Sequence, residues 1–282
     1  MKVREPAVAG GFYPYNPKAL KKTIKNFIDK TKTEKENVIG IVSPHAGYTF
    51  CGKTAASVYK SIGSKFDTVI ILGPNHSGFG DSIATSSASW RTPLGLVNPD
   101  EYIVKEITKD LMITDDERAH VREHSIEVQL PWLQYLFKDF RIVPISINPT
   151  FFDLESCQEI GNKIAEAARK FKRKVLIVAS SDFTHYGRPY GYVPFGGRDT
   201  LEKIKEQDME IIELIKKLDP KSLIKTSYEN HLTICGYGAI ASMLFAAKRL
   251  GAIKGKLIDY STSFDVSKSM EAIVGYAGVA IY

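Results

Sequence analysis

Residues 38–43 read VIGIVS and run directly into PHAGY at residues 44–48. A short apolar run rich in β-branched residues predicts a strand that is buried on both faces. Two more runs have the same character, TVIIL at residues 68–72 and VLIVA at residues 175–179. Strands buried on both faces are typical of a parallel sheet covered by helices, so these three runs indicate the fold class.

Helical patterns alternate with these strands along the chain. Three helices are expected to begin at Asn16-Pro17, Asn98-Pro99 and Asp219-Pro220. Further helices are expected over residues 52–62, 125–137 (with a kink at Pro131), 153–171, 198–218 and 236–250. Further strands are expected at residues 141–147, 257–260 and 272–281. The alternation predicts an α/β fold with a central mixed, largely parallel sheet covered by helices on both faces. No linker interrupts the pattern, so residues 1–282 are expected to form a single domain.

Composition excludes several classes of protein. The formal net charge is +6, and no basic stripe interleaved with aromatic residues suggests a nucleic-acid partner. No apolar run is long enough to span a membrane, and the N-terminal residues resemble no secretory signal. Three cysteines without a C-x-x-C motif argue against a disulfide framework. A soluble protein of the reducing cytoplasm is therefore expected.

Each of the three buried strands is followed by a loop that carries a histidine. His45 follows the first, His76 follows the second, and Asp182 and His185 follow the third. Ligands of open α/β sheets bind outside the carboxyl ends of the strands, so the three histidines point to one shared polar site. Each imidazole could ligate a transition metal, transfer a proton or only hydrogen-bond its own loop. Asp182 could orient His185, ligate a metal or form a turn.

Two further features leave more than one interpretation open. In the segment EHSIE at residues 123–127, His124 lies one helical turn after His120, so the two imidazoles could share a metal on a helix. The same segment could instead be a helix start capped by Ser125. Cys235, in TICGYG, could be a thiolate ligand or a small buried core residue.

These motifs together resemble the Memo family, also described as the class B component of the AMMECR–Memo–radical-SAM gene set. The matching segments span nearly the whole chain in the family's order: REPAVAGGFYP (4–14), SPHAGYTFCG (43–52), GPNHSG (73–78), EHSIEVQLPWLQ (123–134), SSDFTHYG (180–187) and TICGYG (233–238). The resemblance implies a fold similar to the class III extradiol dioxygenases, the LigB-like non-haem iron enzymes.

The resemblance also implies roles for particular residues. The dioxygenases hold Fe(II) with two histidines and a carboxylate, whereas the matching positions here are His45, His76 and Cys235. His185 falls where those enzymes place a catalytic acid/base, with Asp182 beside it. Because thiolate is a softer ligand than carboxylate, one iron or copper ion is expected, and zinc would also be compatible.

Four more residues are expected to line the same pocket. His124 and Glu127 belong to a motif that the family shares, and Tyr48 and Tyr186 flank the histidine motifs as aromatic residues. Aromatic side chains at the mouth of a pocket suggest an aromatic small-molecule substrate, although they are also common in ordinary packing.

Three functions fit these residues. The first is a metal-dependent redox protein or oxidoreductase acting on a small molecule. The second is a non-catalytic adaptor that binds a peptide or protein in the same pocket, with Arg91 or Arg188 contacting an anion. The third is a metal-trafficking protein. The resemblance further suggests a functional link to AMMECR-type and radical-SAM proteins.

Overall fold

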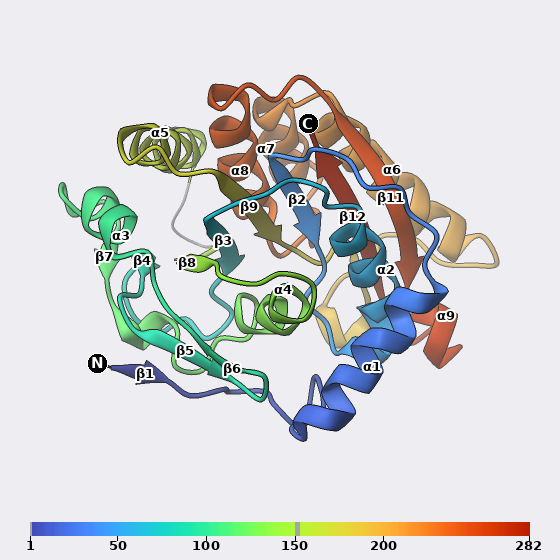
Figure 1. Ribbon diagram of the computed structural model, residues 1–282. Coiled ribbons are helices and arrows are strands. Elements are labelled where there is room, and N and C mark those ends of the chain that lie inside the picture. The colour runs from blue at the N-terminus through green and yellow to red at the C-terminus, as the bar shows by residue number, and fades with distance from the viewer. Residues whose placement is uncertain (1, 150–152) are drawn as a thin grey trace.

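A large mixed sheet forms the centre of the molecule (Figure 1). The computed structural model describes residues 2–149 and 153–282, and within them nine strands join this sheet. Its centre is parallel, in the order β2 (Gly40–Ser43), β9 (Val175–Ser180), β3 (Thr68–Pro74) and β8 (Arg141–Ile147). The sheet continues beyond β2 with β12 (Ala272–Ile281), β10 (His185–Gly187) and β11 (Gly255–Thr262), and beyond β8 with β4 (Ile83–Thr85) and β7 (Thr114–Asp115). The predicted mixed α/β fold is confirmed.

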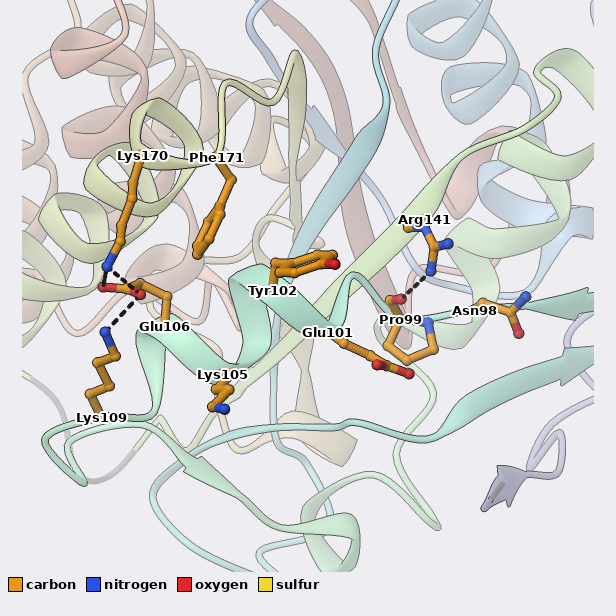
Figure 2. Close-up of a pocket in the computed structure, with 10 residues that line it drawn as sticks. All are labelled: Asn98, Pro99, Glu101, Tyr102, Lys105, Glu106, Lys109, Arg141, Lys170 and Phe171. Carbon is orange, nitrogen blue, oxygen red and sulfur yellow. Dashed lines mark hydrogen bonds and ion pairs between the residues drawn. The ribbon is translucent and has the colours of Figure 1, made fainter.

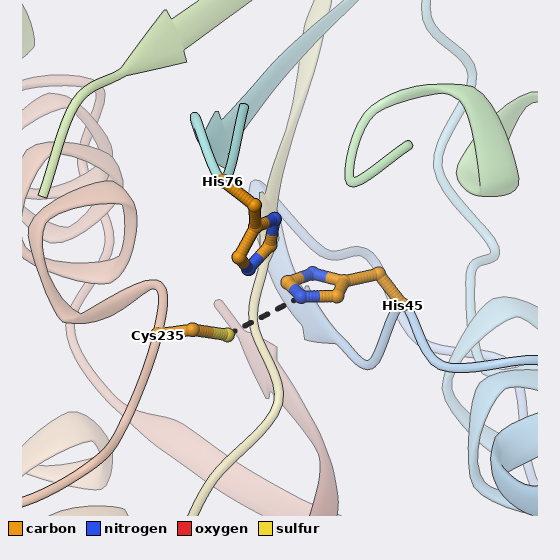
Figure 3. A group of neighbouring side chains, drawn as sticks. All are labelled: His45, His76 and Cys235. Atoms are coloured by element: carbon orange, nitrogen blue, oxygen red, sulfur yellow. Dashed lines mark hydrogen bonds between the residues drawn. The ribbon is translucent and has the colours of Figure 1, made fainter. Parts of the chain in front are cut away.

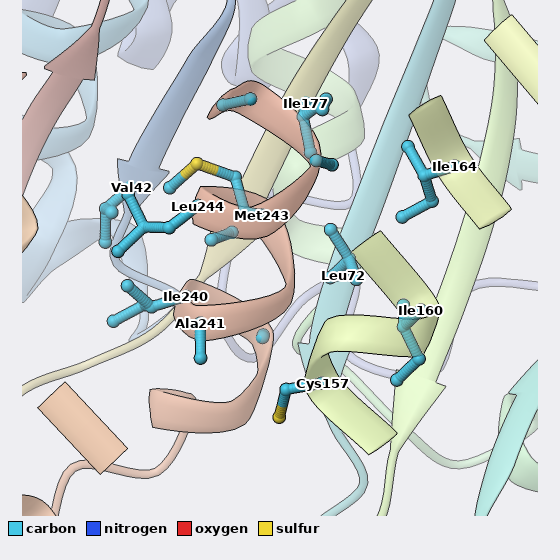
Figure 4. Packing of buried hydrophobic residues seen from close by; sticks show 14 of the residues in the cluster. Val42, Leu72, Cys157, Ile160, Ile164, Ile177, Ile240, Ala241, Met243 and Leu244 are labelled. Atoms are coloured by element: carbon cyan, nitrogen blue, oxygen red, sulfur yellow. The ribbon is translucent and has the colours of Figure 1, made fainter. Parts of the chain in front are cut away.

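Helices cover both faces of this sheet, and alternate strand residues are buried in two different cores. Ile41 and Val69 contribute to one core, whereas their neighbours Val42 and Ile70 contribute to the other. The first face carries α1 (Pro17–Lys30), α2 (Tyr48–Lys60) and α4 (Leu130–Leu136). The second face carries α3 (Glu101–Ile107), α5 (Leu154–Lys170), α6 (Thr200–Lys216), α7 (Pro220–Glu229) and α8 (Tyr237–Arg249). Figure 4 shows the packing of α5 and α8 on this second face. Among the described residues, no helix has both the length and the hydropathy that a membrane crossing requires.

Polar side chains cap several helices where the sequence predicts a start. Asn16, Asp153 and Asp219 each accept a backbone N–H from the first turn of α1, α5 and α7. The expected start at Asn98-Pro99 is wrong, because α3 begins at Glu101. Asp100 is its N-cap, with a side chain that accepts the N–H of Ile103, so the helix cannot begin earlier.

The helix expected over residues 125–137 is also shorter than predicted. A 3₁₀ turn covers Glu127–Gln129, and the α-helix covers only Leu130–Leu136. Pro131 lies in the first turn of that helix, where its missing N–H has no intrahelical partner to lose, so it causes no kink. Ser125 is not a helix cap, because its hydroxyl donates to the carbonyl of Pro74 at 2.8 Å.

Several very short elements were not predicted. A small separate sheet contains β1 (Val3–Arg4), β5 (Ser89–Thr92) and β6 (Gly95–Val97). Single turns cover Glu117–Ala119, Arg188–Tyr190 and α9 (Phe264–Ser267). The pairing of β1 with β5 brings the N-terminal segment next to the loop at residues 120–127, which supplies part of the site.

Candidate metal centre

The carboxyl ends of β2 and β3 bring His45 and His76 to the same edge of the sheet, and Cys235 approaches them from the loop before α8 (Figure 3). His45, His76 and Cys235 each offer one ligand atom, and these three atoms lie within 4.8 Å of one another. The Cys235 Sγ atom is 3.2 Å from Nε2 of His45. The structure therefore brings together the three residues that the sequence indicated as metal ligands.

A buried carboxylate holds His76 in place. Nδ1 of His76 lies 3.0 Å from Oε1 of Glu123, whose oxygens also accept the backbone N–H groups of His76, His124 and Ser125. Burial favours the neutral acid, but the hydrogen bond and charge of His76 lower the pKa of Glu123 to about 2. A carboxylate only accepts hydrogen bonds, so Nδ1 of His76 carries a proton. Burial opposes protonation, but the hydrogen bonds with Cys235 and Glu123 raise the pKa of His76 to about 10, so a metal at the other ring nitrogen would have to displace a second proton.

Glu123 also belongs to a second group of residues that could hold a metal ion. His76, Glu123 and His124 also form a group of neighbouring ligand atoms, but the oxygens of Glu123 are already surrounded by N–H donors. The His124 ring stacks on His76 with centroids 4.8 Å apart. His120 lies elsewhere, fully buried against Trp90, so the proposed sharing of a metal by His120 and His124 is wrong.

His185 lines the cavity beside these ligands, and two carbonyl groups orient its ring. Nδ1 of His185 is 2.9 Å from the carbonyl oxygen of Phe183 and 3.0 Å from that of Thr233. Both partners can only accept, so Nδ1 carries the proton and Nε2 is free to exchange one with a bound molecule.

Asp182 fixes the His45 loop. Its Oδ1 atom accepts the backbone N–H of His45 at 2.8 Å, and its side chain is buried. Burial raises the pKa of Asp182, with the charge of His185 acting in the opposite direction. The idea that Asp182 orients the ring of His185 is not supported, since the carbonyls of Phe183 and Thr233 hold that ring.

Glu127 does not line the cavity, contrary to expectation. It is fully buried, forms an ion pair with Arg4 and accepts the hydroxyl of Tyr13 and the backbone N–H groups of Ala7 and Val8. Its charge is therefore used to hold the N-terminal segment against the loop that carries Glu123.

Tyr48 and Tyr186 are also absent from the cavity lining. Tyr48 is buried in the core and donates to the carbonyl of Val128 at 2.7 Å. The hydroxyl of Tyr186 donates to the carbonyl of Phe195, and its side chain lines a different hollow together with Arg188. Nearness in sequence to a histidine motif did not place either side chain toward the site.

The cavity lined by His45 and His76 has a volume of about 560 Å³. It is lined by aromatic rings, hydroxyl groups and the polar residues of the site: Phe12, Phe50, Tyr190 and Tyr276; Ser263, Ser267 and Ser269; His45, His76, His124, Asp182 and His185; and Ala46, Gly47, Ala272 and Val274. Much of this wall comes from the C-terminal segment after β11, which no motif had indicated. Among the described residues that line it there is no lysine or arginine.

A second hollow, of about 820 Å³, lies between α3 and the end of α5 (Figure 2). Its lining includes the rings of Tyr102 and Phe171. Glu106 pairs there with Lys109 and Lys170. None of the predicted site residues lines this hollow, which is at the opposite end of the parallel strands, near the start of β8.

Fold and site define a mixed α/β protein with a His–His–Cys cluster at the carboxyl edge of its parallel strands. The model of the Memo family, described as Memo-like protein, matches residues 4–280. The chain therefore belongs to the Memo family.

Curated relatives match nearly the whole chain. A MEMO1 family protein of Methanosarcina barkeri is 41% identical over 280 residues, 99% of this chain and 100% of the relative. A MEMO1 family protein of Thermococcus onnurineus is 44% identical over 289 aligned positions, 98% of each chain. A crystal structure of the uncharacterized protein JW3007 from Escherichia coli K12 aligns with a TM-score of 0.41 and 13% identity, covering 87% of this chain and 100% of that one.

Proposed function

We propose that this Memo family protein binds one iron or copper ion through His45, His76 and Cys235 and acts as a redox protein or oxidoreductase on a small molecule. The observation that carries the proposal is the convergence of two imidazoles and one thiol, from distant parts of the chain, within 4.8 Å of one another. A carboxylate behind His76 adds the outer-shell partner that metal-bound histidines commonly have.

The donor set fits such an ion. Two neutral imidazoles and a thiolate suit copper, iron and also zinc. Burial raises the pKa of the Cys235 thiol, with the neighbouring His76 ring acting in the opposite direction, so a bound cation would favour loss of the thiol proton. An iron or copper ion held there would supply one-electron redox chemistry to a molecule bound beside it.

The remaining residues of the cavity suit a bound small molecule. Nε2 of His185 would accept or donate a proton, because Nδ1 already donates to carbonyl groups. Phe12, Phe50 and Tyr190 offer aromatic surface, and the 560 Å³ cavity is of the size that small ligands occupy. An uncharged aromatic substrate is thereby favoured, in keeping with the dioxygenase-like fold that the family resemblance implies.

The adaptor role receives less support. An anionic peptide group would need a cation, but the described lining of the cavity contains neither lysine nor arginine. Arg91 pairs with Glu5 at 2.9 Å, and Arg188 lines another hollow. Metal trafficking would use the same three ligands without turnover. A link to AMMECR-type and radical-SAM proteins rests on family membership alone.

The test is oxygen consumption by protein loaded anaerobically with Fe(II) or Cu(I) and supplied with a panel of uncharged aromatic compounds. We expect turnover in the wild type, and in His185→Ala we expect full metal content with turnover reduced about a hundredfold or more. His231→Ala, which replaces an exposed histidine, is the control. A metal-loaded wild type that oxidises none of these compounds would contradict the oxidoreductase proposal.

A further inference from the structure

A buried serine lies directly behind His45. Oγ of Ser180 is 3.0 Å from Nδ1 of His45, 2.8 Å from Nε2 of Gln129 and 2.6 Å from the carbonyl oxygen of Ser125. Ser180 and Gln129 are fully buried, and His45 is 2% exposed. The hydrogen bonds among these groups must therefore be satisfied within the protein.

Two neighbours fix the orientation of the Gln129 side-chain amide. Its nitrogen donates to the carbonyl of Pro44 at 2.9 Å, and its oxygen accepts the hydroxyl of Tyr59 at 2.8 Å. The reversed amide would place two oxygens against each other at Pro44. The amide nitrogen therefore faces Ser180 and donates a hydrogen bond to it.

The donors and acceptors around Ser180 determine which ring nitrogen of His45 carries a proton. The Ser180 hydroxyl has one proton, and the carbonyl of Ser125 can only accept it. Gln129 can only donate to the hydroxyl oxygen, so the remaining contact requires a donor on His45. Nδ1 of His45 therefore carries a proton, which leaves a lone pair on Nε2, the atom 3.2 Å from the Cys235 sulfur.

We infer that Ser180 and Gln129 are positioning residues that hold His45 in its Nδ1–H tautomer before any metal arrives. Free neutral histidine favours the other tautomer in water, in which Nε2 is protonated and cannot ligate. The Ser180–Gln129 pair removes that conflict through neutral hydrogen bonds, whereas at His76 the Glu123 carboxylate holds the proton on Nδ1. The relevance to metal binding rests on the proposed function, but the tautomer is a property of the metal-free protein.

The test combines two readouts on the full-length protein. Ring nitrogen shifts of ¹⁵N-histidine-labelled, metal-free protein report the tautomer, and competition titration with Cu(I) or Fe(II) reports affinity. We expect Nδ1–H in the wild type, a mixture of tautomers in Ser180→Ala, and metal affinity weakened about tenfold to a hundredfold. Ser180→Thr, which keeps the hydroxyl, should restore both readouts.

Ser146→Ala is the matched control, since Ser146 is buried on the parallel strand β8 and its hydroxyl lacks a hydrogen-bond partner among the described residues. It should change neither readout. An Nε2–H tautomer in the wild type would overturn the inference without any variant, as would unchanged ring shifts in folded Ser180→Ala. If the wild type shows the Nδ1–H tautomer but binds neither ion, the inference holds and the proposed function fails.

Discussion

Glu123 places a negative charge next to His76, and a substitution at Glu123 tests the effect of that charge on metal affinity. In Glu123→Gln one acceptor oxygen becomes an NH₂ group facing N–H donors, and the anion beside His76 disappears. We expect the affinity for Cu(I) or Fe(II) to fall about tenfold to a hundredfold, because the basicity of His76 decreases. Competition titration measures the loss.

Glu117→Gln is the control for that variant. Glu117 accepts the hydroxyl of Ser86 at 2.6 Å and contacts none of the three ligands, so affinity should not change. Equal affinity in wild type and Glu123→Gln would show that the carboxylate is not part of the metal site's support.

Burial of His120 should make the stability of the folded protein depend on pH. Burial lowers the pKa of His120 to about 4, compared with 6.5 when the residue is exposed. The unfolded chain therefore binds more protons between these values, and the free energy of unfolding falls as the pH drops through that window, by up to about 3 kcal/mol. In His120→Leu this part of the pH dependence should vanish.

Urea denaturation near pH 7 and again near pH 4 measures this effect. His231→Leu, a change at an exposed histidine, should keep the wild-type pH dependence. A His120→Leu protein that loses as much stability on acidification as the wild type would contradict the assignment.

Residue types near strand ends were enough to indicate His45, His76 and, through the family resemblance, Cys235 as a group. They were not enough to separate side chains that line the cavity from those behind it. Glu127 lies in the same EHSIE segment as Glu123, yet its carboxylate pairs with the buried guanidinium of Arg4, which needs a negative partner. Such partners come from distant segments and leave no local signal in the sequence.

At the scale of elements, the start of α8 determines where Cys235 lies. A Cβ atom on Gly236 would be 2.6 Å from both the carbonyl oxygen of Ser180 and Cβ of Ser181. Gly236→Ala should therefore push the loop and Cys235 away from His45 and weaken metal binding by about tenfold or more. Metal titration is the measurement, and Gly196→Ala, with nothing within 4 Å of the added methyl group, is the control. Unchanged affinity would show that the loop can adjust.

Close packing of α5 against α8 predicts a loss of stability that leaves the site intact. A Cβ atom on Gly161 would be 2.5 Å from Cβ of Phe245 and 2.8 Å from the carbonyl oxygen of Ser242. Gly161→Ala should lower the free energy of unfolding by about 1–3 kcal/mol, because the two helices must separate. Chemical denaturation measures this change, with Gly196→Ala again as the control. A Gly161→Ala protein as stable as the wild type would contradict the close packing.

Elements with long apolar patterns could be predicted well from the sequence. The predicted strands 141–147 and 272–281 match β8 and β12 at both ends. Two- and three-residue strands such as β7 and β10 were missed, because their ladders depend on the partner strand and are too short to show a period of two. The α-helix expected over residues 125–137 begins only at Leu130, because Glu127–Gln129 form a 3₁₀ turn. The side chains of Ser125 and Gln129 there donate to the carbonyls of Pro74 and Pro44.

For the whole molecule, the parallel centre of the sheet connects fold and site. Because β2, β9 and β3 are adjacent and parallel, their following loops meet at one edge, and the loop before α8 joins them there. The two cores on either side of the sheet hold these strand ends in register. Removing a ligand side chain should therefore abolish metal binding while leaving the fold unchanged.

Metal content after anaerobic purification from the native host tests the central claim most directly. The account predicts about one iron or copper ion per wild-type chain, near-zero occupancy in His45→Ala and Cys235→Ser, and full occupancy in Cys157→Ser, whose thiol is buried against α8. A folded wild type that carries no transition metal, or a Cys235→Ser protein that retains its full complement, would contradict it.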